Sequence, residues 1–360
     1  MNASGWSSLG PEHIWEGAGV IGRVGEEVRR FSDRVLIVVD DNGWPKVYQA
    51  VEESLRRAGV AFCIHPFKGY CSQNNVEQIV QKARGFDAGV ILGVGGGRVM
   101  DTAKSVSAAL KCRVITLPTC AATCAAYVQL CVWYDDQGRS RPGITIPEAV
   151  AAMIADTDVL VSTCPPRLLA SGIADALAKY PELEYNVRLF PLPGCTENFY
   201  VALSVAQRCY EFLMKSGPAA LNDMLKGTNS EIVRETVRSV ITMTGLASAL
   251  VAGVKQLAVA HMFYSGVATL WRHTRDMYLH GEIVSCGIPL QMAANGRSEL
   301  EIRHMINLLS GIGTPVCLSE LEIEPMEGNR TLLLDHIHEN GFDDPVVFER
   351  IQRGFALIYR

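Results

Sequence analysis

The sequence predicts two structural halves, an α/β fold over residues 1–162 and an all-helical fold over residues 163–360. Three observations lead to this division. Short runs of Val, Ile and Leu alternate with helical patterns through the first half, which is typical of a parallel sheet covered by helices. Pro165-Pro166 then marks a break, after which strand patterns largely stop. The remaining segments repeat apolar residues at helical spacing.

The elements of the first half follow from these patterns in order. The stripe formed by Val20, Val24 and Val28 predicts a helix over residues 17–31, and Ser72 is placed to cap a later helix. The other helices are predicted at residues 44–58, 74–86 and 102–110. Apolar runs predict strands at residues 34–39, 61–66, 88–94, 113–117, 128–134 and 153–161. Asp135-Asp136-Gln137-Gly138 predicts a hairpin turn.

Helices of the second half are predicted at residues 167–180, 197–215, 230–254, 258–270 and 298–309. Because proline cannot donate a backbone hydrogen bond, the first of them is expected to end or kink at Tyr180-Pro181.

Composition limits the possible classes of function. The chain has 360 residues, of which 48% are hydrophobic and 20% charged, as in globular proteins. Its net charge of −5 gives no support for nucleic-acid binding. The 11 cysteines are odd in number and form no CxxC pair, and residues 1–12 lack a secretory pattern, so we expect reduced thiols and a cytoplasmic protein. No apolar run is long enough to predict a membrane span.

The stretch from Gly93 to Lys104 carries the first candidate site. An apolar strand ends in Gly95, Gly96 and Gly97 and turns into a helix. Glycines let the backbone approach a ligand closely, and the free N–H groups of a helix start favour a phosphate. The pattern therefore predicts a pyrophosphate site, although a ligand-free turn has the same local sequence.

Other polar residues fall at the same predicted edge of the sheet, where ligands of parallel sheets bind. Asp40-Asp41 and Pro118-Thr119 both follow strands. A carboxylate there can accept hydrogen bonds from a ribose and repels a 2′-phosphate, which favours NAD over NADP. The alternative is a pair of solvated turn acids before Asn42-Gly43.

The second half contains a candidate metal site. Asp175, His261 and His280 each interrupt or border an apolar segment. One carboxylate and two imidazoles suit Zn²⁺ or Fe²⁺ and leave positions open for a substrate oxygen. The two histidines are too distant in sequence to share neighbouring turns of one helix, so only tertiary folding can join them. Each residue alone is also explained as a hydrogen-bonded core group, and this explanation is favoured for an isolated buried His.

The motifs together resemble a known family. They are Gly-Val-Gly-Gly-Gly-x-x-x-Asp-Thr-Ala-Lys at 93–104, Pro-Thr at 118–119, Gly-Ile-x-Asp-Ala-Leu-Ala at 172–178, Ala-His at 260–261 and His-Gly-Glu at 280–282. In this order and spacing the chain resembles the glycerol-dehydrogenase-like branch of the iron-containing (group III) alcohol dehydrogenases, a superfamily that includes dehydroquinate-synthase-like enzymes. The resemblance spans nearly the whole chain.

The resemblance implies a dinucleotide-binding α/β domain, a helical domain and a metal in the cleft between them. It implies metal ligation by Asp175, His261 and His280. It also implies NAD contacts at Asp41, Gly95, Gly96, Gly97, Arg98, Asp101, Thr119, Leu130 and Tyr134.

Residues 121–126 and 132–138 are similar to a bacterial subgroup of hydroxycarboxylate dehydrogenases, which reduce 2-oxo acids. Three departures from the glycerol dehydrogenases matter. Cys124 stands where those enzymes carry an Asp that holds a substrate hydroxyl, which makes glycerol itself doubtful because a thiol is a weak acceptor. Val128 replaces a cofactor-contacting Ser. Tyr264 replaces a second His and is a candidate proton relay, although a phenol ordinarily has a pKa of about 10.

The resemblance implies an NAD(P)-dependent, metal-containing oxidoreductase that transfers hydride to or from a small hydroxy or oxo substrate. The alternatives are a dehydroquinate-synthase-type lyase that regenerates its NAD, or a catalytically altered member. A carboxylate substrate needs a cationic partner, and sequence position offers Lys179 and Arg272. Family membership also leads us to expect a homo-oligomer.

Overall fold

The computed structural model describes residues 8–193 and 195–359, so most of the N-terminal stretch 1–12 lies outside the described residues. The chain forms two compact units. The first runs to Pro165 and also takes in Asp223–Ala249, and the second comprises Pro166–Asn222 and the chain from Leu250 onward. Asp223–Ala249 therefore returns to the first unit, a feature that the sequence division at residue 162 does not contain.

A six-stranded parallel sheet organises the first unit, with the strand order β1-β8-β5-β4-β2-β3. Every residue of β4 is buried, because helices cover both faces of a parallel sheet. Its strands are β1 (His13–Gly17), β2 (Arg34–Val39), β3 (Ala61–Pro66), β4 (Val90–Gly95), β5 (Arg113–Pro118) and β8 (Ala152–Asp156). A separate antiparallel hairpin joins β6 (Leu130–Tyr134) to β7 (Ser140–Thr145).

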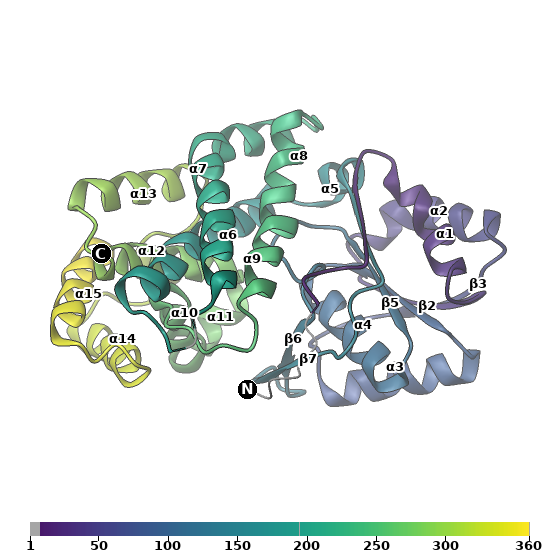
Figure 1. Cartoon of the computed structure of the whole chain (residues 1–360), viewed down its shortest axis with the longest axis horizontal. Helices are drawn as coiled ribbons and strands as arrows, with labels where there is room; N and C mark the ends of the chain where they lie inside the picture. The colour runs from purple at the N-terminus through teal and green to yellow at the C-terminus, as the bar shows by residue number, and fades with distance from the viewer. Residues whose placement is uncertain (1–7, 194, 360) are drawn as a thin grey trace. The chain divides into compact units, whose positions relative to one another are not determined.

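Helices α1 and α2 lie on one side of this sheet, and α3 and α4 on the other (Figure 1). Ser72 caps α3 as predicted, since its side chain accepts a hydrogen bond from the backbone of Asn75. The helical segments of this unit are η1 (Val20–Arg23), α1 (Val24–Arg29), α2 (Trp44–Arg57), α3 (Gln73–Phe86), α4 (Gly97–Leu110), α5 (Thr157–Thr163), α8 (Glu231–Arg238), the π-helical turn η3 (Ser239–Met243) and α9 (Thr244–Leu250).

Two sequence predictions for this unit are wrong in part. Residues 17–31 are not one helix, because Gly17 and Gly19 have φ values of +136° and +73° and separate strand β1 from a short 3₁₀ turn. Strand β8 ends at Asp156 instead of continuing to residue 161. The carboxylate of Asp156 accepts hydrogen bonds from the backbone N–H groups of Asp158 and Val159 and so starts helix α5.

Helices joined by loops make up the second unit, which has no strand among its described residues. Its core joins α10, α12, α14 and α15 around Phe263, Leu290, Phe342 and Phe355, all fully buried. The helical segments are α6 (Pro166–Glu184), the π-helical turn η2 (Tyr185–Leu189), α7 (Glu197–Leu225), α10 (Val259–Leu270), α11 (Arg272–Met277), α12 (His280–Ala294), α13 (Glu299–Gly311), η4 (Ser319–Leu321), α14 (Glu327–Glu339) and α15 (Pro345–Ile358).

Of the two outcomes predicted at Tyr180-Pro181, an end or a kink of helix α6, the structure excludes the end. It continues through Pro181 to Glu184 and passes into the π-helical turn. The carbonyl of Pro181 accepts a hydrogen bond from Asn295 of α12, and this part of α6 is buried. Tertiary packing therefore outweighs the local cost of the proline. Among the described helices, none combines the length and the apolar character that a membrane crossing requires.

Candidate functional site

Asp175, His261 and His280, which the sequence could not place relative to one another, come together in the second unit. Nε2 of His261 lies 3.4 Å from Oδ1 of Asp175, and Nε2 of His280 lies 3.3 Å from the same oxygen. The three side chains place one potential ligand atom each within 4.8 Å of one another. Both imidazole nitrogens thus face a single carboxylate oxygen.

Close helix packing produces this cluster. Asp175 lies on α6, His261 on α10 and His280 on α12, and these helices lie side by side (Figure 1). A Cβ on Gly281 would lie 1.9 Å from the carbonyl oxygen of Ser171 in α6. Helix α12 therefore approaches α6 at a distance that only glycine allows, directly beside His280.

The start of α12 is fixed by Glu282. Its carboxylate accepts a hydrogen bond from the backbone N–H of Leu279 at 2.8 Å, which satisfies one of the unpaired donors at the start of the helix. Arg167 at the start of α6 donates two hydrogen bonds to the same carboxylate, at 2.6 and 2.8 Å. A bidentate guanidinium–carboxylate pair of this kind fixes both distance and orientation. In the His-Gly-Glu motif, His280 is thus the candidate ligand, Gly281 lets α12 approach α6, and Glu282 binds Arg167 of α6.

The electrostatics of the cluster fit a cation. Burial by itself raises the pKa of Asp175, but His280 and His261 outweigh it and hold that pKa well below its usual range. Asp175 is only 8% exposed, so its charge needs a positive neighbour. Burial lowers the pKa of His261, yet the charge of Glu182 and the hydrogen bonds that the ring donates to Asp175 and Glu182 raise it to about 9. A buried carboxylate facing two imidazole nitrogens is a donor set that suits a divalent metal.

Tyr264 of α10, the proton-relay candidate, and His273 of α11 lie in the same unit as this cluster. The ring of Tyr264 packs edge-on against the imidazole of His280, with the ring centroids 4.3 Å apart. His273 is exposed and is not one of the residues grouped with Asp175. Tyr264 therefore borders the cluster and His273 does not belong to it.

The glycine stretch lies at the carboxyl end of β4, as predicted, and is shaped by Asp40. A Cβ on Gly95 would lie 2.4 Å from Oδ2 of Asp40, so this approach requires glycine. The same oxygen accepts a hydrogen bond from the N–H of Gly96, and Oδ1 accepts from Asn42 and Gly43. The carboxylate of Asp40 thus holds backbone N–H groups of both loops. Asp41, in contrast, is exposed and forms an ion pair with Lys68 at 3.0 Å.

Helix α4 begins directly after this loop without a side-chain cap at Gly96. Its first N–H groups are therefore placed to bind an anion, and this observation fits the pyrophosphate of a dinucleotide. Arg98 donates to the carbonyl of Gly69 at 3.1 Å, and its guanidinium lies 5.6 Å from the ring centroid of Tyr70. Tyr70 in turn packs against Tyr134 at 5.2 Å, which connects two of the predicted cofactor residues.

Asp101 and Lys104 form a buried ion pair, with Oδ1 and Nζ 3.1 Å apart. Lys104 is fully buried. Its ammonium donates hydrogen bonds to the backbone carbonyls of Ala125, Val128 and Leu130 at 2.9, 3.0 and 2.6 Å. Lys104 therefore ties α4 to the segment that follows Cys124 and leads into β6.

Of the remaining predicted residues of the first unit, Thr119 lies at the same edge and Leu130 lies in the separate hairpin. The backbone N–H of Thr119 donates to the carbonyl of Gly95 at 3.0 Å. A Cβ on Gly97 would lie 3.4 Å from the hydroxyl of Thr123, so the loop that contains Cys124 packs beside the glycine stretch. Leu130 is exposed at the first position of β6.

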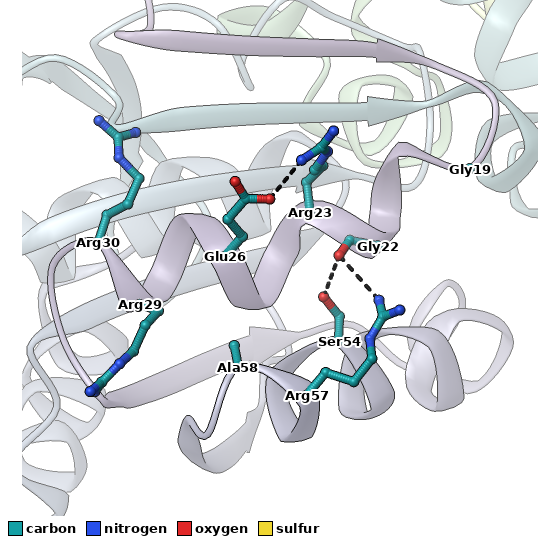
Figure 2. Close-up of a pocket in the computed structure, with 9 residues that line it drawn as sticks. All are labelled: Gly19, Gly22, Arg23, Glu26, Arg29, Arg30, Ser54, Arg57 and Ala58. Atoms are coloured by element: carbon teal, nitrogen blue, oxygen red, sulfur yellow. Dashed lines mark hydrogen bonds and ion pairs between the residues drawn. The ribbon is translucent and has the colours of Figure 1, made fainter.

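An arginine-lined hollow lies elsewhere in the first unit, between η1, α1 and the end of α2 (Figure 2). Its volume is about 840 Å³, and it contains none of the predicted site residues. Figure 2 shows the guanidinium groups pointing in different directions. Arg23 and Arg30 are ion-paired with Glu26 and Glu27, both at 2.7 Å. The hollow therefore lacks the converging donors of an anion site.

Sequence reasoning missed two residues that organise these sites, Glu182 and Lys104. Glu182 follows Asp175 by two helical turns, so helical periodicity places both on one face. Lys104 follows Asp101 by three residues, the spacing of a helical ion pair. Both signals were present in the sequence, but neither indicates by itself what the side chain contacts.

Comparison with known proteins places the chain in a family. Residues 11–157 match the family described as iron-containing alcohol dehydrogenase. A glycerol dehydrogenase of Escherichia coli is 32% identical over 318 residues, covering 87% of this chain and 84% of that protein. The chain belongs to the iron-containing alcohol dehydrogenase family. The predicted resemblance to this family is confirmed. The chain is therefore a metal-dependent oxidoreductase that acts on small hydroxy substrates.

Other relatives carry different names. Hydroxycarboxylate dehydrogenase A of Escherichia coli is 31% identical over 260 residues, covering 72% of this chain and 69% of that protein. Among solved structures, a probable glycerol dehydrogenase from Sinorhizobium meliloti has a TM-score of 0.80 at 23% identity, covering 96% of this chain and 97% of that one. Its likeness confirms the predicted fold class, an α/β part followed by a helical part.

Proposed function

We propose that Asp175, His261 and His280 hold one divalent metal ion, Zn²⁺ or Fe²⁺, and that this family member is an NAD-dependent dehydrogenase of a small hydroxy or oxo substrate. The observation that carries the proposal is the single oxygen of Asp175 facing both imidazole Nε2 atoms, at 3.4 and 3.3 Å. A divalent metal in such a site supplies Lewis-acid polarisation of a substrate oxygen, and a nicotinamide supplies or accepts the hydride.

The chain's own residues prepare the site for this chemistry. Glu182 accepts a hydrogen bond from Nδ1 of His261, which leaves Nε2 for a ligand role. Gly281 and Glu282 hold His280 against α6. Tyr264, packed against His280, is the proposed group that passes a proton to or from the substrate oxygen.

In the first unit, the glycine stretch and the uncapped start of α4 are the proposed binding site for the cofactor's pyrophosphate. Asp41 follows β2 and is exposed, and its surface ion pair with Lys68 leaves carboxylate lone pairs for a ribose hydroxyl. Because a carboxylate repels a 2′-phosphate, we propose NAD as the preferred cofactor. Arg98, Asp101, Thr119, Leu130 and Tyr134 are proposed to shape or line this site.

The deciding experiment measures NADH oxidation by metal-loaded protein against 2-oxo acids, aldehydes and hydroxyketones. Asp175→Asn keeps the size of the side chain and removes its charge. We expect wild-type protein to bind about one divalent ion and to consume NADH in proportion to product, and the variant to lose both properties. NADH that is recycled instead of consumed would contradict a dehydrogenase, and wild-type protein that retains no metal would contradict the ligand assignment.

A further inference from the structure

We infer that Lys179 binds the carboxylate of the substrate, and that the substrate class is a 2-oxo or 2-hydroxy acid. This inference rests on the proposed function, because it takes Asp175, His261 and His280 as the reacting centre. Lys179 lies on α6 four residues after Asp175 and three before Glu182. These spacings put the three side chains on one face of the helix.

That helix face is the one turned towards the metal cluster. Asp175 and Glu182, which flank Lys179 on it, lie 3.4 and 2.7 Å from the two nitrogens of the His261 ring. Lys179 is half-buried. The helix thus presents a cation next to the candidate ligands.

None of the described residues neutralises the charge of Lys179. No hydrogen bond or ion pair joins it to another described residue. Its two acidic neighbours on α6 are both engaged by His261. Arg272, the other cation considered from the sequence, is exposed, and its Nε lies 3.6 Å from the carboxylate of Asp276. Of these two candidates, only Lys179 has a charge left for a ligand.

A charge count indicates which ligand this is. The carboxylates of Asp175 and Glu182 together balance one divalent ion when both histidines are neutral. Lys179 then leaves the loaded site with a single positive charge in a half-buried position, where pairing is stronger than at an exposed surface. A monoanionic 2-oxo acid matches this charge, because its carbonyl and carboxylate are adjacent groups of one small molecule. A neutral polyol leaves the ammonium without a partner.

The test compares two substrates that differ only where Lys179 is expected to act. Pyruvate and hydroxyacetone share a methyl ketone, and a carboxylate in the first is replaced by a hydroxymethyl group in the second. Metal-loaded wild type, Lys179→Met, Lys179→Gln and the control Arg272→Met are assayed with NADH on both. We expect the Lys179 variants to lose about 10- to 100-fold in kcat/KM for pyruvate and to change less than about 3-fold for hydroxyacetone. Arg272→Met should match wild type on both substrates.

A binding measurement without turnover accompanies the kinetics. Oxamate, an unreactive analogue of a 2-oxo acid, is titrated calorimetrically into protein loaded with metal and NADH. Its Kd should rise about 10- to 100-fold in both Lys179 variants, while their metal content and unfolding temperature stay at the wild-type values. Three outcomes would each overturn the inference and leave the dehydrogenase proposal standing. The Lys179 variants could lose equal activity on pyruvate and hydroxyacetone, or their Kd for oxamate could stay unchanged. The third outcome is wild-type protein that is active on hydroxyacetone alone. Failure of wild type to bind metal or to oxidise NADH would instead reject the proposed function itself.

Discussion

The carboxylate of Glu182 lies 2.7 Å from Nδ1 of His261 and accepts a second hydrogen bond, at 3.1 Å, from the backbone N–H of the same residue. Two contacts to one oxygen fix both the position of His261 and the rotation of its ring. Metal-binding histidines commonly have such a carboxylate behind them, which orients the ring and raises its basicity. Glu182 is therefore a positioning residue for the proposed metal site.

We predict that Glu182→Gln weakens metal binding by about 10- to 100-fold, because the amide keeps the shape of the side chain but loses the charge. The Kd for Zn²⁺ is measured by competition with a chelator. Glu184→Gln is the matched control, since Glu184 is also a buried glutamate of α6 but pairs with Arg297 at 2.7 Å. An equal loss in both variants would show that buried charge on α6, and not the contact with His261, sets the affinity.

Metal uptake should release a proton from His261 near neutral pH. The pKa of this residue is raised to about 9, so at pH 7 the metal-free protein carries a protonated ring. A ligand nitrogen must be unprotonated, and the apparent affinity for Zn²⁺ should therefore increase by up to about tenfold per pH unit between pH 7 and 9. Calorimetry in two buffers with different ionisation enthalpies counts the protons. Zn²⁺ binding that releases no proton at pH 7 would contradict this expectation.

The same pKa determines how the stability of the metal-free protein depends on pH. The pKa of His261 in the folded state is above its value of about 6.5 in the unfolded chain. Protonated His261 thus stabilises the fold fully below pH 6.5, and this contribution is lost as the pH rises through about 9. The unfolding temperature of metal-free protein should fall over this range. His261→Gln should remove that part of the pH dependence.

Gly281→Ala tests whether close packing of α12 on α6 places His280. The added methyl group would lie 1.9 Å from the carbonyl oxygen of Ser171, so the helices must separate. We expect a loss of about 1–3 kcal/mol in the free energy of unfolding, together with weaker metal binding. Gly328→Ala is the control, because no atom lies within 4 Å of its added Cβ. If Gly281→Ala is destabilised but binds metal with full affinity, the close packing stabilises the fold and does not place His280.

Lys104→Met tests the buried pair with Asp101. Removing the ammonium leaves the carboxylate and three backbone carbonyls without their donor. Breaking a buried pair in this way costs about 3–5 kcal/mol, and NADH binding should weaken because the segment after Cys124 loses its attachment to α4. The double variant Lys104→Met/Asp101→Leu should recover part of the stability measured by urea unfolding. Full NADH affinity in a destabilised Lys104→Met would contradict the role of the ammonium in positioning that segment.

Local periodicity and turn residues were enough to predict the α/β and helical halves, most strands of the sheet and the glycine stretch. Asp175, His261 and His280 were also candidates before the fold was known. Their meeting could not be predicted, because the contact depends on α12 reaching α6 at Gly281. In the same way α6 continues through Pro181, and β8 gives way to α5, since long-range packing and the Asp156 cap outweigh local propensity. The roles of Glu182, Lys104 and Lys179 depend on which partners surround each charge, and that is a property of the folded chain alone.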